Sequence, residues 1–505
     1  MNRTTQSLIA VVVALGAVTG FAAFGGTDDT GDDGAKAAAR LPVERTSLLC
    51  PVPSASDLAE TSYTAFTPKA GGAEAKGKAG GAEAKGKAEL LPVSKALTDA
   101  AKEKDKKAKP FLTQQTPGEP VAGEASGAES PALIGTADGG LAPGWTVQQT
   151  TTYAAGSGRG MHGTNCTAPD TDFWFPGTST AKDRSDYIHL TNPDDSAAVV
   201  DVQLYGPDGE VTSAVGDSIQ VQPHSSVPVL LSTLADKKQT NLTMHVTARS
   251  GRVAAAVQSS DEKLGGDWLP AAADPADSLV LPGIPKDATS VRLVAYAPGS
   301  DDADLKVQLA SPTGAITPAG SQSLQVKSGM TAAVDLGDVT KGEAGSLLLT
   351  PTDKPVPVVA ALRVTRGKGS KQETAFIPAT PAVGARATVA DNRAKGSTLS
   401  LVAPGKSAKV KVTASAGTEG GSPAAKTYTV KGGTTLDIAD PPVPAGLKGS
   451  YALTVEPVSG GPVHASRMLS APEEGIPMFT IQTLPDDRGT VEVPKAERDL
   501  AVLQK

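Results

Sequence analysis

The residues of this chain whose types could support chemistry gather in one short stretch. His162, Asp170, Asp172, Asp186 and His189 lie within 28 residues, and two histidines with three carboxylates are a conceivable set of metal ligands. The stretch has neither an EF-hand spacing nor a His-x-x-x-His pair, and acidic residues in turns cap strands by default. We therefore expect no metal and no other cofactor, with His162, Asp170 and Asp172 as the candidate ligands if one binds.

Other catalytic patterns in the chain lack their partners. Gly158, Gly160 and Gly163 have the dinucleotide-binding spacing, but no helix follows them, so we interpret residues 156–163 as a flexible loop. Ser-x-x-Lys occurs twice, yet the companion motifs Ser-Asp-Asn and Lys-Thr-Gly are absent. There is no Gly-x-Ser-x-Gly, and the five histidines are too scattered to nominate a triad. We expect a non-enzymatic protein without catalytic residues.

Composition narrows the class of protein further. The chain has 505 residues, a net charge of −7 and only 4% aromatic residues. A chain without an excess of basic residues is not typical of nucleic-acid-binding proteins. Because aromatic residues are scarce, the hydrophobic cores must consist mainly of Val, Leu and Ala.

The N-terminus has the features of an export signal. Residues 8–24 form an uncharged, mostly apolar run of 17 residues, with Arg3 before it and four aspartates at 28–33 after it. This charge order places the C-terminal bulk outside the cytoplasm, and the length is at the short end for a membrane span. We expect a signal anchor at 1–25 in the cell membrane; the alternative is cleavage near Ala23-Phe24-Gly25 and secretion.

Export also bears on the two cysteines. Cys50 and Cys166 are the only cysteines, and an oxidising compartment favours a bond between them. Two buried free thiols are the alternative.

A segment of biased composition separates the two cysteines. The sequence AGGAEAKGK occurs at 70–78 and again at 79–87, and a Lys-rich run and a Pro/Gly/Glu-rich run follow. Such a composition buries too little apolar surface to offset the chain entropy lost on folding. We expect residues 69–142 to be a disordered insertion.

After this segment the chain consists of short strands and turns, and their order repeats. Val200, Val202 and Leu204 alternate with polar residues, as in half-buried antiparallel strands. LTNP, YAPG and VAPG each end a strand, and their prolines at 193, 298 and 404 are 105 and 106 residues apart. This period predicts an all-β protein of three tandem immunoglobulin-like sandwiches, with a β-propeller of two blades per unit as the alternative.

A strand with an aromatic residue precedes each repeat. Trp174, Trp268 and Phe376 stand at corresponding places, so we expect them in the first strand of each unit with their rings in the sandwich core. The expected organisation is a signal anchor at 1–25, a linker at 26–45, strands joining the first sandwich at 46–68, the disordered insertion at 69–142, and sandwiches at 143–265, 266–372 and 373–505.

The stretch CTAPDTDFWFPGTSTAKDRSDYIHLTNP, with LLCP upstream, resembles a family of exported actinobacterial proteins known as domain of unknown function 5719. The matching residues are Cys166, Pro169, Asp172, Trp174, Phe175, Gly177, Arg184, Leu190, Asn192 and Pro193. We interpret Asp172, Trp174, Phe175, Gly177, Arg184, Asn192 and Pro193 as a structural motif, with Asp172 capping a turn or pairing with Arg184. The resemblance implies an anchored or secreted envelope protein and no catalytic activity.

These observations favour a membrane-anchored extracytoplasmic protein that binds or scaffolds. Its partners would be the membrane, through the N-terminal helix, and an envelope protein or a cell-wall glycan, but not nucleic acid. The rival classes are an envelope hydrolase or transferase, with its site near His162, Asp170 and Asp172, and an accessory factor for cell-wall glycan assembly.

Overall fold

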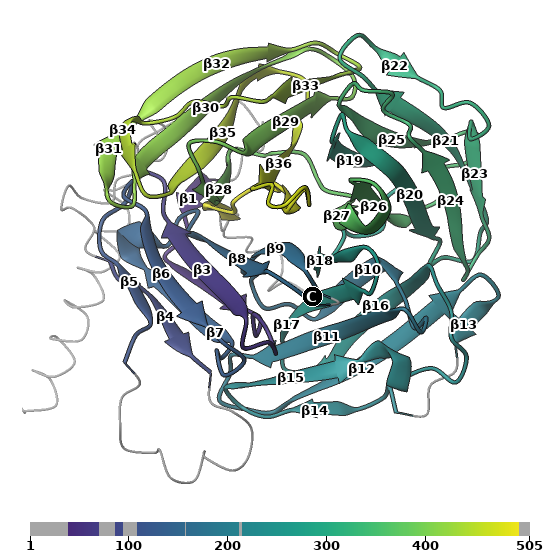
Figure 1. The fold of residues 1–505 in the computed structure, drawn as a ribbon, viewed down its shortest axis with the longest axis horizontal. Helices are drawn as coiled ribbons and strands as arrows, with labels where there is room; N and C mark the ends of the chain where they lie inside the picture. Colours follow the sequence, from purple (N-terminus) through teal and green to yellow (C-terminus); the bar gives the residue numbers. More distant parts are fainter. Residues whose placement is uncertain (1–38, 70–85, 94–108, 157, 212–214, 494–505) are drawn as a thin grey trace, which may run out of the picture. The chain divides into compact units, whose positions relative to one another are not determined.

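A computed structural model describes residues 39–69, 86–93, 109–156, 158–211 and 215–493. Every regular element in these ranges is a β-strand or a short 3-10 turn, and the named strands between Arg45 and Thr483 pair antiparallel (Figure 1). The all-β class is thus confirmed. None of the described helices is long and apolar enough to cross a membrane, and the expected anchor at 1–25 and linker up to residue 38 lie outside the described residues.

Residues Leu41–Val491 form one compact body, which consists of four modules with the same strand order. The first module contains β2 (Arg45–Cys50), β3 (Ala59–Phe66), β4 (Ala88–Pro92), β5 (Leu112–Gln114), β6 (Val121–Ser126), β7 (Leu133–Asp138), β8 (Thr146–Tyr153) and β9 (Gly160–Asn165). The second contains β10 (Asp172–Thr178), β11 (Arg184–Asn192), β12 (Ala198–Gly206), β13 (Gly209–Val211), β14 (Ile219–Val221), β15 (Ser225–Leu230), β16 (Leu242–Ser250), β17 (Ala254–Asp261) and β18 (Gly265–Leu269).

The third and fourth modules repeat this arrangement. The third contains β19 (Leu279–Ile284), β20 (Ala288–Tyr296), β21 (Ala303–Ala310), β22 (Ala315–Ile316), β23 (Ser323–Val326), β24 (Thr331–Gly337), β25 (Gly345–Pro351), β26 (Val359–Arg366) and β27 (Glu373–Pro378). The fourth contains β28 (Ala387–Asn392), β29 (Ser397–Ala403), β30 (Ala408–Gly417), β31 (Gly420–Ser422), β32 (Ala424–Val430), β33 (Thr434–Ile438), β34 (Ala445–Lys448), β35 (Tyr451–Gly460), β36 (His464–Ser470) and β37 (Phe479–Thr483). Short 3-10 turns occur at Gly139–Leu141, Leu231–Thr233 and Gly369–Lys371.

Each module is a sandwich of two sheets. In the first module the sheet orders are β2-β7-β4-β5 and β6-β3-β8-β9, and in the second they are β10-β16-β12 with β13 and β14 at the edge, and β15-β11-β17-β18. The predicted alternation in β12 is confirmed, because Val200, Val202 and Leu204 are buried in the core between the two sheets. Apart from a few aromatic rings, Met244 and the two cysteines, the four cores consist of Val, Leu, Ile and Ala side chains.

This strand order does not confirm the immunoglobulin-like type of sandwich that the sequence predicts. In an immunoglobulin domain the first strand pairs with the second, whereas here β10 pairs with β16 and β11 pairs with β15 and β17. Within one module the chain crosses repeatedly from one sheet to the other, and both sheets bury their apolar side chains in one shared core. They are therefore halves of a sandwich and not successive propeller blades.

The expected disordered insertion at 69–142 is also wrong for its described parts. They contain β4 to β7, which complete the first module, and only residues 70–85 and 94–108 of the segment lie outside the described residues. Leu90, Leu112 and Leu133 are buried in the core of this module. A few leucines in short strands were enough to form a core, although the average composition of the segment is polar.

The module boundaries differ from the three predicted units for the same reason. Strands 46–68 and 143–165 belong to one N-terminal module, which the repeat analysis missed. Trp268 lies in β18 and Phe376 in β27, the last strands of the second and third modules, whereas Trp174 lies in β10, a first strand. The predicted equivalence of these three aromatic residues is therefore wrong.

The last strands of the modules meet inside the body. Strand β9 lies against β18 and β37, and β27 lies against β18 and β37, so that the four strands form a closed circuit (Figure 1). The first and fourth modules also touch through β28, which packs against β3 and β8. The modules are thus parts of one compact body and not independent domains joined only by linkers.

The terminal strands pair with each other. Strand β1 (Ala39–Pro42) pairs with β38 (Thr490–Val493), and Arg40 forms an ion pair of 3.0 Å with Glu492 on the exposed surface of this pair.

Candidate functional site

The predicted disulfide is present. Cys50 at the end of β2 and Cys166 just after β9 are bonded, with 4.4 Å between their Cα atoms, and both are buried. Backbone hydrogen bonds between Leu49 and Thr167, of 2.8 and 3.0 Å, flank the bond. Because β2 and β9 are the first and last strands of one module, the disulfide closes that module and does not join two domains.

Asp170 and Asp172 have local roles at the start of β10. The Oδ1 atom of Asp170 accepts a hydrogen bond of 2.8 Å from the amide of Thr171. Asp172 Oδ2 lies 2.9 Å from His245 Nε2 on the neighbouring strand, and its side chain is half exposed. Neither expected partner of Asp172, a turn amide or Arg184, is the one observed.

The ring of Trp174 is buried, but not in the sandwich core. Phe173 and Phe175, its neighbours in β10, point into the core of the second module. Trp174 therefore points to the opposite face, where it stacks on His245 with 3.7 Å between ring centroids and packs near Tyr296 of the third module. The expectation of a core position is wrong, because strand alternation puts this ring between two modules.

Arg184 is the best-connected residue of the predicted motif. Its guanidinium forms two hydrogen bonds with Asp186, of 3.2 and 2.7 Å, and also donates to the Gly177 carbonyl and the Ser259 hydroxyl. Both charged side chains are buried. Burial raises the pKa of the Asp186 carboxyl, and the adjacent Arg184 charge acts against that rise.

Asn192 and Pro193 build the turn after β11. The Asn192 amide donates to the carbonyls of Ser196 and Val221, at 2.8 and 3.0 Å, and its oxygen accepts from the amide of Asp194 at 2.9 Å. These contacts give Asn192 a structural role.

His162 lies in the interior of the body. It belongs to β9, so the end of the predicted glycine loop is a strand. Its Nε2 atom lies 2.9 Å from the Gly158 carbonyl, and its ring packs on that of Tyr153. Burial lowers the pKa of His162 to about 4, so the ring is neutral at pH 7. None of its contacts involves Asp170 or Asp172, and the proposed catalytic or metal-binding trio is not brought together.

Two carboxylates that the sequence analysis missed lie where the last strands meet. Glu373 in β27 accepts hydrogen bonds from the amides of Met161 in β9 (2.8 Å) and Phe479 in β37 (3.0 Å). Asp267 in β18 accepts from the Gly163 amide (2.9 Å) and from the hydroxyl of Thr480 (2.8 Å). Both are fully buried. Burial raises the pKa of Glu373 to about 8 and that of Asp267 well above its ordinary value.

No group of three or more His, Cys, Asp or Glu side chains in the described ranges is arranged to hold a metal ion. The buried carboxylates instead connect strands, because each accepts hydrogen bonds from two other modules.

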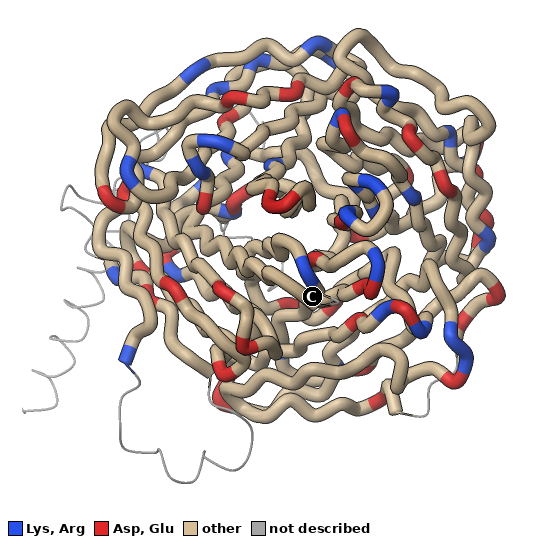
Figure 2. The backbone as a smooth tube through the Cα atoms, viewed as in Figure 1, with Lys and Arg blue, Asp and Glu red and all other residues tan. Residues whose placement is uncertain are grey.

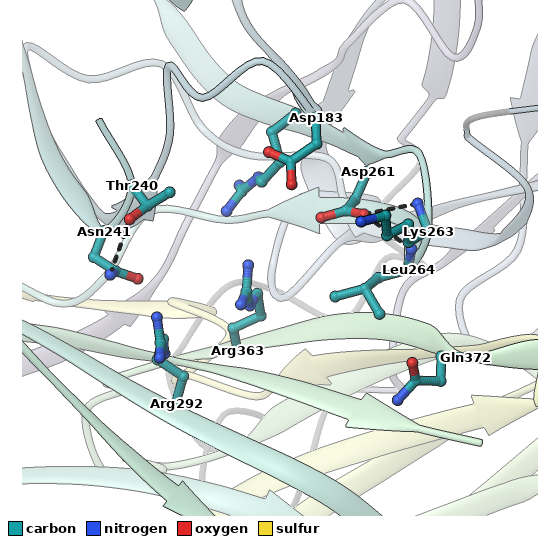
Figure 3. Close-up of a pocket in the computed structure, with 10 residues that line it drawn as sticks. Asp183, Thr240, Asn241, Asp261, Lys263, Leu264, Arg292, Arg363 and Gln372 are labelled. Atoms are coloured by element: carbon teal, nitrogen blue, oxygen red, sulfur yellow. Dashed lines mark hydrogen bonds between the residues drawn. The ribbon is translucent and has the colours of Figure 1, made fainter. Parts of the chain in front are cut away.

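A pocket of about 250 Å³ lies between the second and third modules (Figure 3). It is lined by Asp183, Arg184, Thr240, Asn241, Asp261, Lys263, Leu264, Arg292, Arg363 and Gln372. Arg292 and Arg363 come from β20 and β26 of the third module and point toward the wall that carries Asp183 and Asp261. Lysine and arginine residues are otherwise interspersed with acidic residues along the body (Figure 2).

Arg363 is the unusual residue of this pocket. It forms no hydrogen bond and no ion pair within the described part of the chain, and its side chain is partly buried. Burial and, after it, the nearby charges of Arg184 and Arg292 lower the pKa of Arg363 to about 10, while Asp261 and Asp186 act in the opposite direction. The pocket therefore contains a partly buried positive charge without a directly bonded counter-ion.

Of the residues predicted from the sequence, only Arg184 lines this pocket. For the two arginines of the third module, the sequence offered one indication of a special role. Each is a single basic residue inside an otherwise apolar strand: Arg292 lies between Val291 and Leu293, and Arg363 lies between Leu362 and Val364. Nothing in the sequence indicated that the two strands and the turn after β17 lie at one module boundary.

Comparison with known proteins identifies a family but no activity. A family of unknown function, DUF5719, matches residues 121–441, more than half of the chain, and the protein belongs to this family. No curated protein matches. Among solved structures, the α-L-rhamnosidase of Streptomyces avermitilis in complex with L-rhamnose is 9% identical and covers 86% of this chain. The match spans 59% of that enzyme, with a TM-score of 0.12, which is too low to support an argument.

Proposed function

We propose that this protein is a non-enzymatic binding or scaffold protein of the cell envelope, held in the membrane by residues 8–24 with its body outside the cytoplasm. The charge order around the apolar run supports this orientation. The buried disulfide supports an oxidising compartment.

The observation that carries a binding role is the unneutralised guanidinium of Arg363 in a pocket between two modules. A charge that is partly withdrawn from water without a bonded partner costs stability, and such costs persist mainly where function requires them. The closed circuit of last strands supports the pocket by fixing the two modules that form its walls. The hydrolase or transferase alternative has no comparable support, because His162, Asp170 and Asp172 do not meet.

The location is tested with intact cells that express the full chain with a C-terminal tag. A membrane-impermeant, amine-reactive label should modify the protein before lysis and leave a cytosolic control protein unmodified. Labelling only after lysis would contradict an extracytoplasmic body.

The binding role is tested by chemical cross-linking in the same cells. Wild-type protein should be cross-linked to envelope material that the Arg363→Gln variant captures less well. Arg252→Gln is the matched control, because Arg252 is exposed and pairs with Asp194 far from the pocket. Equal capture by wild-type protein and Arg363→Gln would contradict a binding role for the pocket.

A further inference from the structure

The two walls of the pocket differ in how their charges are matched. In the second module, Arg184 donates hydrogen bonds to Asp186, to the Gly177 carbonyl and to Ser259, so the Asp186 carboxylate already neutralises its charge. The Oδ1 atom of Asp261 accepts from the amides of Lys263 and Leu264, at 2.9 Å each, and thereby forms the turn between β17 and β18. These hydrogen bonds hold the wall in place, and the positive charge of Arg184 is neutralised.

The wall of the third module is not balanced. Arg292 and Arg363 are direct cross-strand partners in β20 and β26, so their side chains project from the same face of the sheet. Arg292 has one contact with a carboxylate, at 3.4 Å from the half-exposed Asp335. Arg363 has none in the described residues. Like charges that lie directly opposite on a sheet repel each other, and this pair is stable only if the rest of the body holds it in place.

An anion between the two guanidinium groups would remove this repulsion. Arginine presents a planar fork that matches carboxylate and phosphate groups with two parallel hydrogen bonds. The rest of the lining suits a hydroxylated ring: Thr240, Asn241 and Gln372 offer neutral hydrogen-bonding groups, and Leu264 offers a small apolar surface. The volume of about 250 Å³ is below the range of roughly 300–1,000 Å³ of pockets for drug-sized ligands, so one sugar residue is the appropriate size.

We propose that this pocket binds one acidic sugar residue, with Arg363 and Arg292 holding its carboxylate or phosphate group and Thr240, Asn241 and Gln372 contacting its hydroxyl groups. This inference rests on the proposed binding function and specifies its ligand as an acidic saccharide.

The test is titration calorimetry on the purified full chain in detergent, at low and moderate salt. Glucuronate and glucose 6-phosphate are the probes for the carboxylate and the phosphate. Glucose, inorganic phosphate and N-acetyl-aspartate amide are the comparison ligands. We expect at least one acidic sugar to bind at least about tenfold more tightly than glucose, because charge-assisted hydrogen bonds are the strong ones, and the affinity to fall as salt rises. Whichever acidic sugar binds more tightly identifies the anionic group.

The variants connect binding to the pocket. Arg363→Gln should weaken binding of the acidic sugar by about tenfold or more, whereas Arg252→Gln should leave it unchanged. Binding that Arg363→Gln does not alter would overturn the assignment, as would a failure of both acidic sugars to bind. Inorganic phosphate binding as tightly as the sugar phosphate would show a bare anion site, and equal binding of the aspartate derivative would show a peptide site. In each of these cases cell-surface labelling and cross-linking would still report on the proposed function independently.

Discussion

Arg184 and Arg363 lie on opposite walls of one pocket, and their surroundings differ. Arg184 is buried against a carboxylate that is itself buried, with several further acceptors in reach. Arg363 faces two other arginines and has no carboxylate at hydrogen-bonding distance in the described residues. At the scale of the residue, one arginine is part of the structure, and the other is retained at a cost in stability that a ligand would offset.

This contrast predicts opposite effects of the same substitution. Arg184→Gln should lower the free energy of unfolding by about 3–5 kcal/mol, because it leaves Asp186 buried without its counter-charge. Arg363→Gln should leave that free energy within about 0.5 kcal/mol of the wild type or raise it, since it removes repulsion. Urea unfolding of both variants at pH 7 measures the difference. A loss of several kcal/mol in Arg363→Gln would show that Arg363 supports the fold.

The buried carboxylate of Glu373 predicts a pH dependence of stability. Its pKa is raised from the ordinary value of 4.5 to about 8, so the folded protein holds this proton more tightly than the unfolded chain. The contribution is fully favourable below pH 4.5 and is lost as the pH rises toward 8. Arg159 and Arg366 nearby oppose the shift, and Asp267 is raised in the same direction. The neutral His162 acts oppositely, because its pKa is lowered.

Glu373→Gln isolates this contribution. Glutamine does not titrate. Its NH₂ group would face one of the two backbone N–H groups from which the Glu373 carboxyl group accepts, so two donors would oppose each other. The variant should therefore be less stable by about 1–3 kcal/mol at pH 5. The difference between wild type and variant should shrink between pH 5 and pH 8. Urea unfolding curves at pH 5, 6.5 and 8 test this, and a difference that stays constant over this range would contradict the assigned shift.

At the scale of elements, β9 depends on glycines for close approach to its neighbours. A Cβ at Gly163 would lie 2.5 Å from Gln482 Nε2 and 2.6 Å from a methyl carbon of Thr480. A Cβ at Gly160 would lie 2.2 Å from Glu373 Oε1, and Gly160 also has a φ of +127°. The glycine spacing that resembles a dinucleotide motif is thus a consequence of strand packing in the interior.

We expect Gly163→Ala to destabilise the protein by about 1–3 kcal/mol, as overpacking of an interior does. Gly299→Ala is the control, since nothing lies within 4 Å of the added Cβ and its φ is not in the left-handed region. It should change the free energy of unfolding by less than about 0.5 kcal/mol. Thermal melting of both variants provides the measurement. Equal melting temperatures would mean that β9 and β37 can separate without cost.

The strands also differ in how well the sequence predicts them. Long strands with alternating residues, such as β12, and the disulfide could be predicted because their signals are local in sequence or in chemistry. Strands β4, β5 and β7 of the first module could not: β5 has three residues, and β4 and β7 each follow a polar segment. The pocket could not be predicted either, because Arg363 and Lys263 are 100 residues apart and meet only through the contact of two modules.

At the scale of the whole body, the closed circuit of β9, β18, β27 and β37 links the stability of the four modules. Buried carboxylates reinforce the circuit: Glu373 of the third module binds strands of the first and fourth. The contact between the ends of the body adds a further connection, where the buried ion pair of Arg386 and Asp487 packs beside Gly144 of the first module. Modules connected in this way should not unfold one at a time.

The disulfide provides the test of this coupling. It spans 116 residues of the first module only, and opening a loop of this size should cost about 4–5 kcal/mol in the chain-entropy model. If the modules are independent, reduction should lower the melting of the first module and leave the other three unchanged. Because β9 contacts the second and fourth modules, we expect instead one calorimetric transition that shifts as a whole by about 5 °C.

The Cys50→Ser, Cys166→Ser double variant should melt like the reduced wild type and should not respond to reductant. Hydrogen exchange on the reduced protein locates the effect: protection should fall in β18 and β37 together with β9. A second transition at the original temperature, with β37 still fully protected, would show that the circuit does not transmit stability between modules.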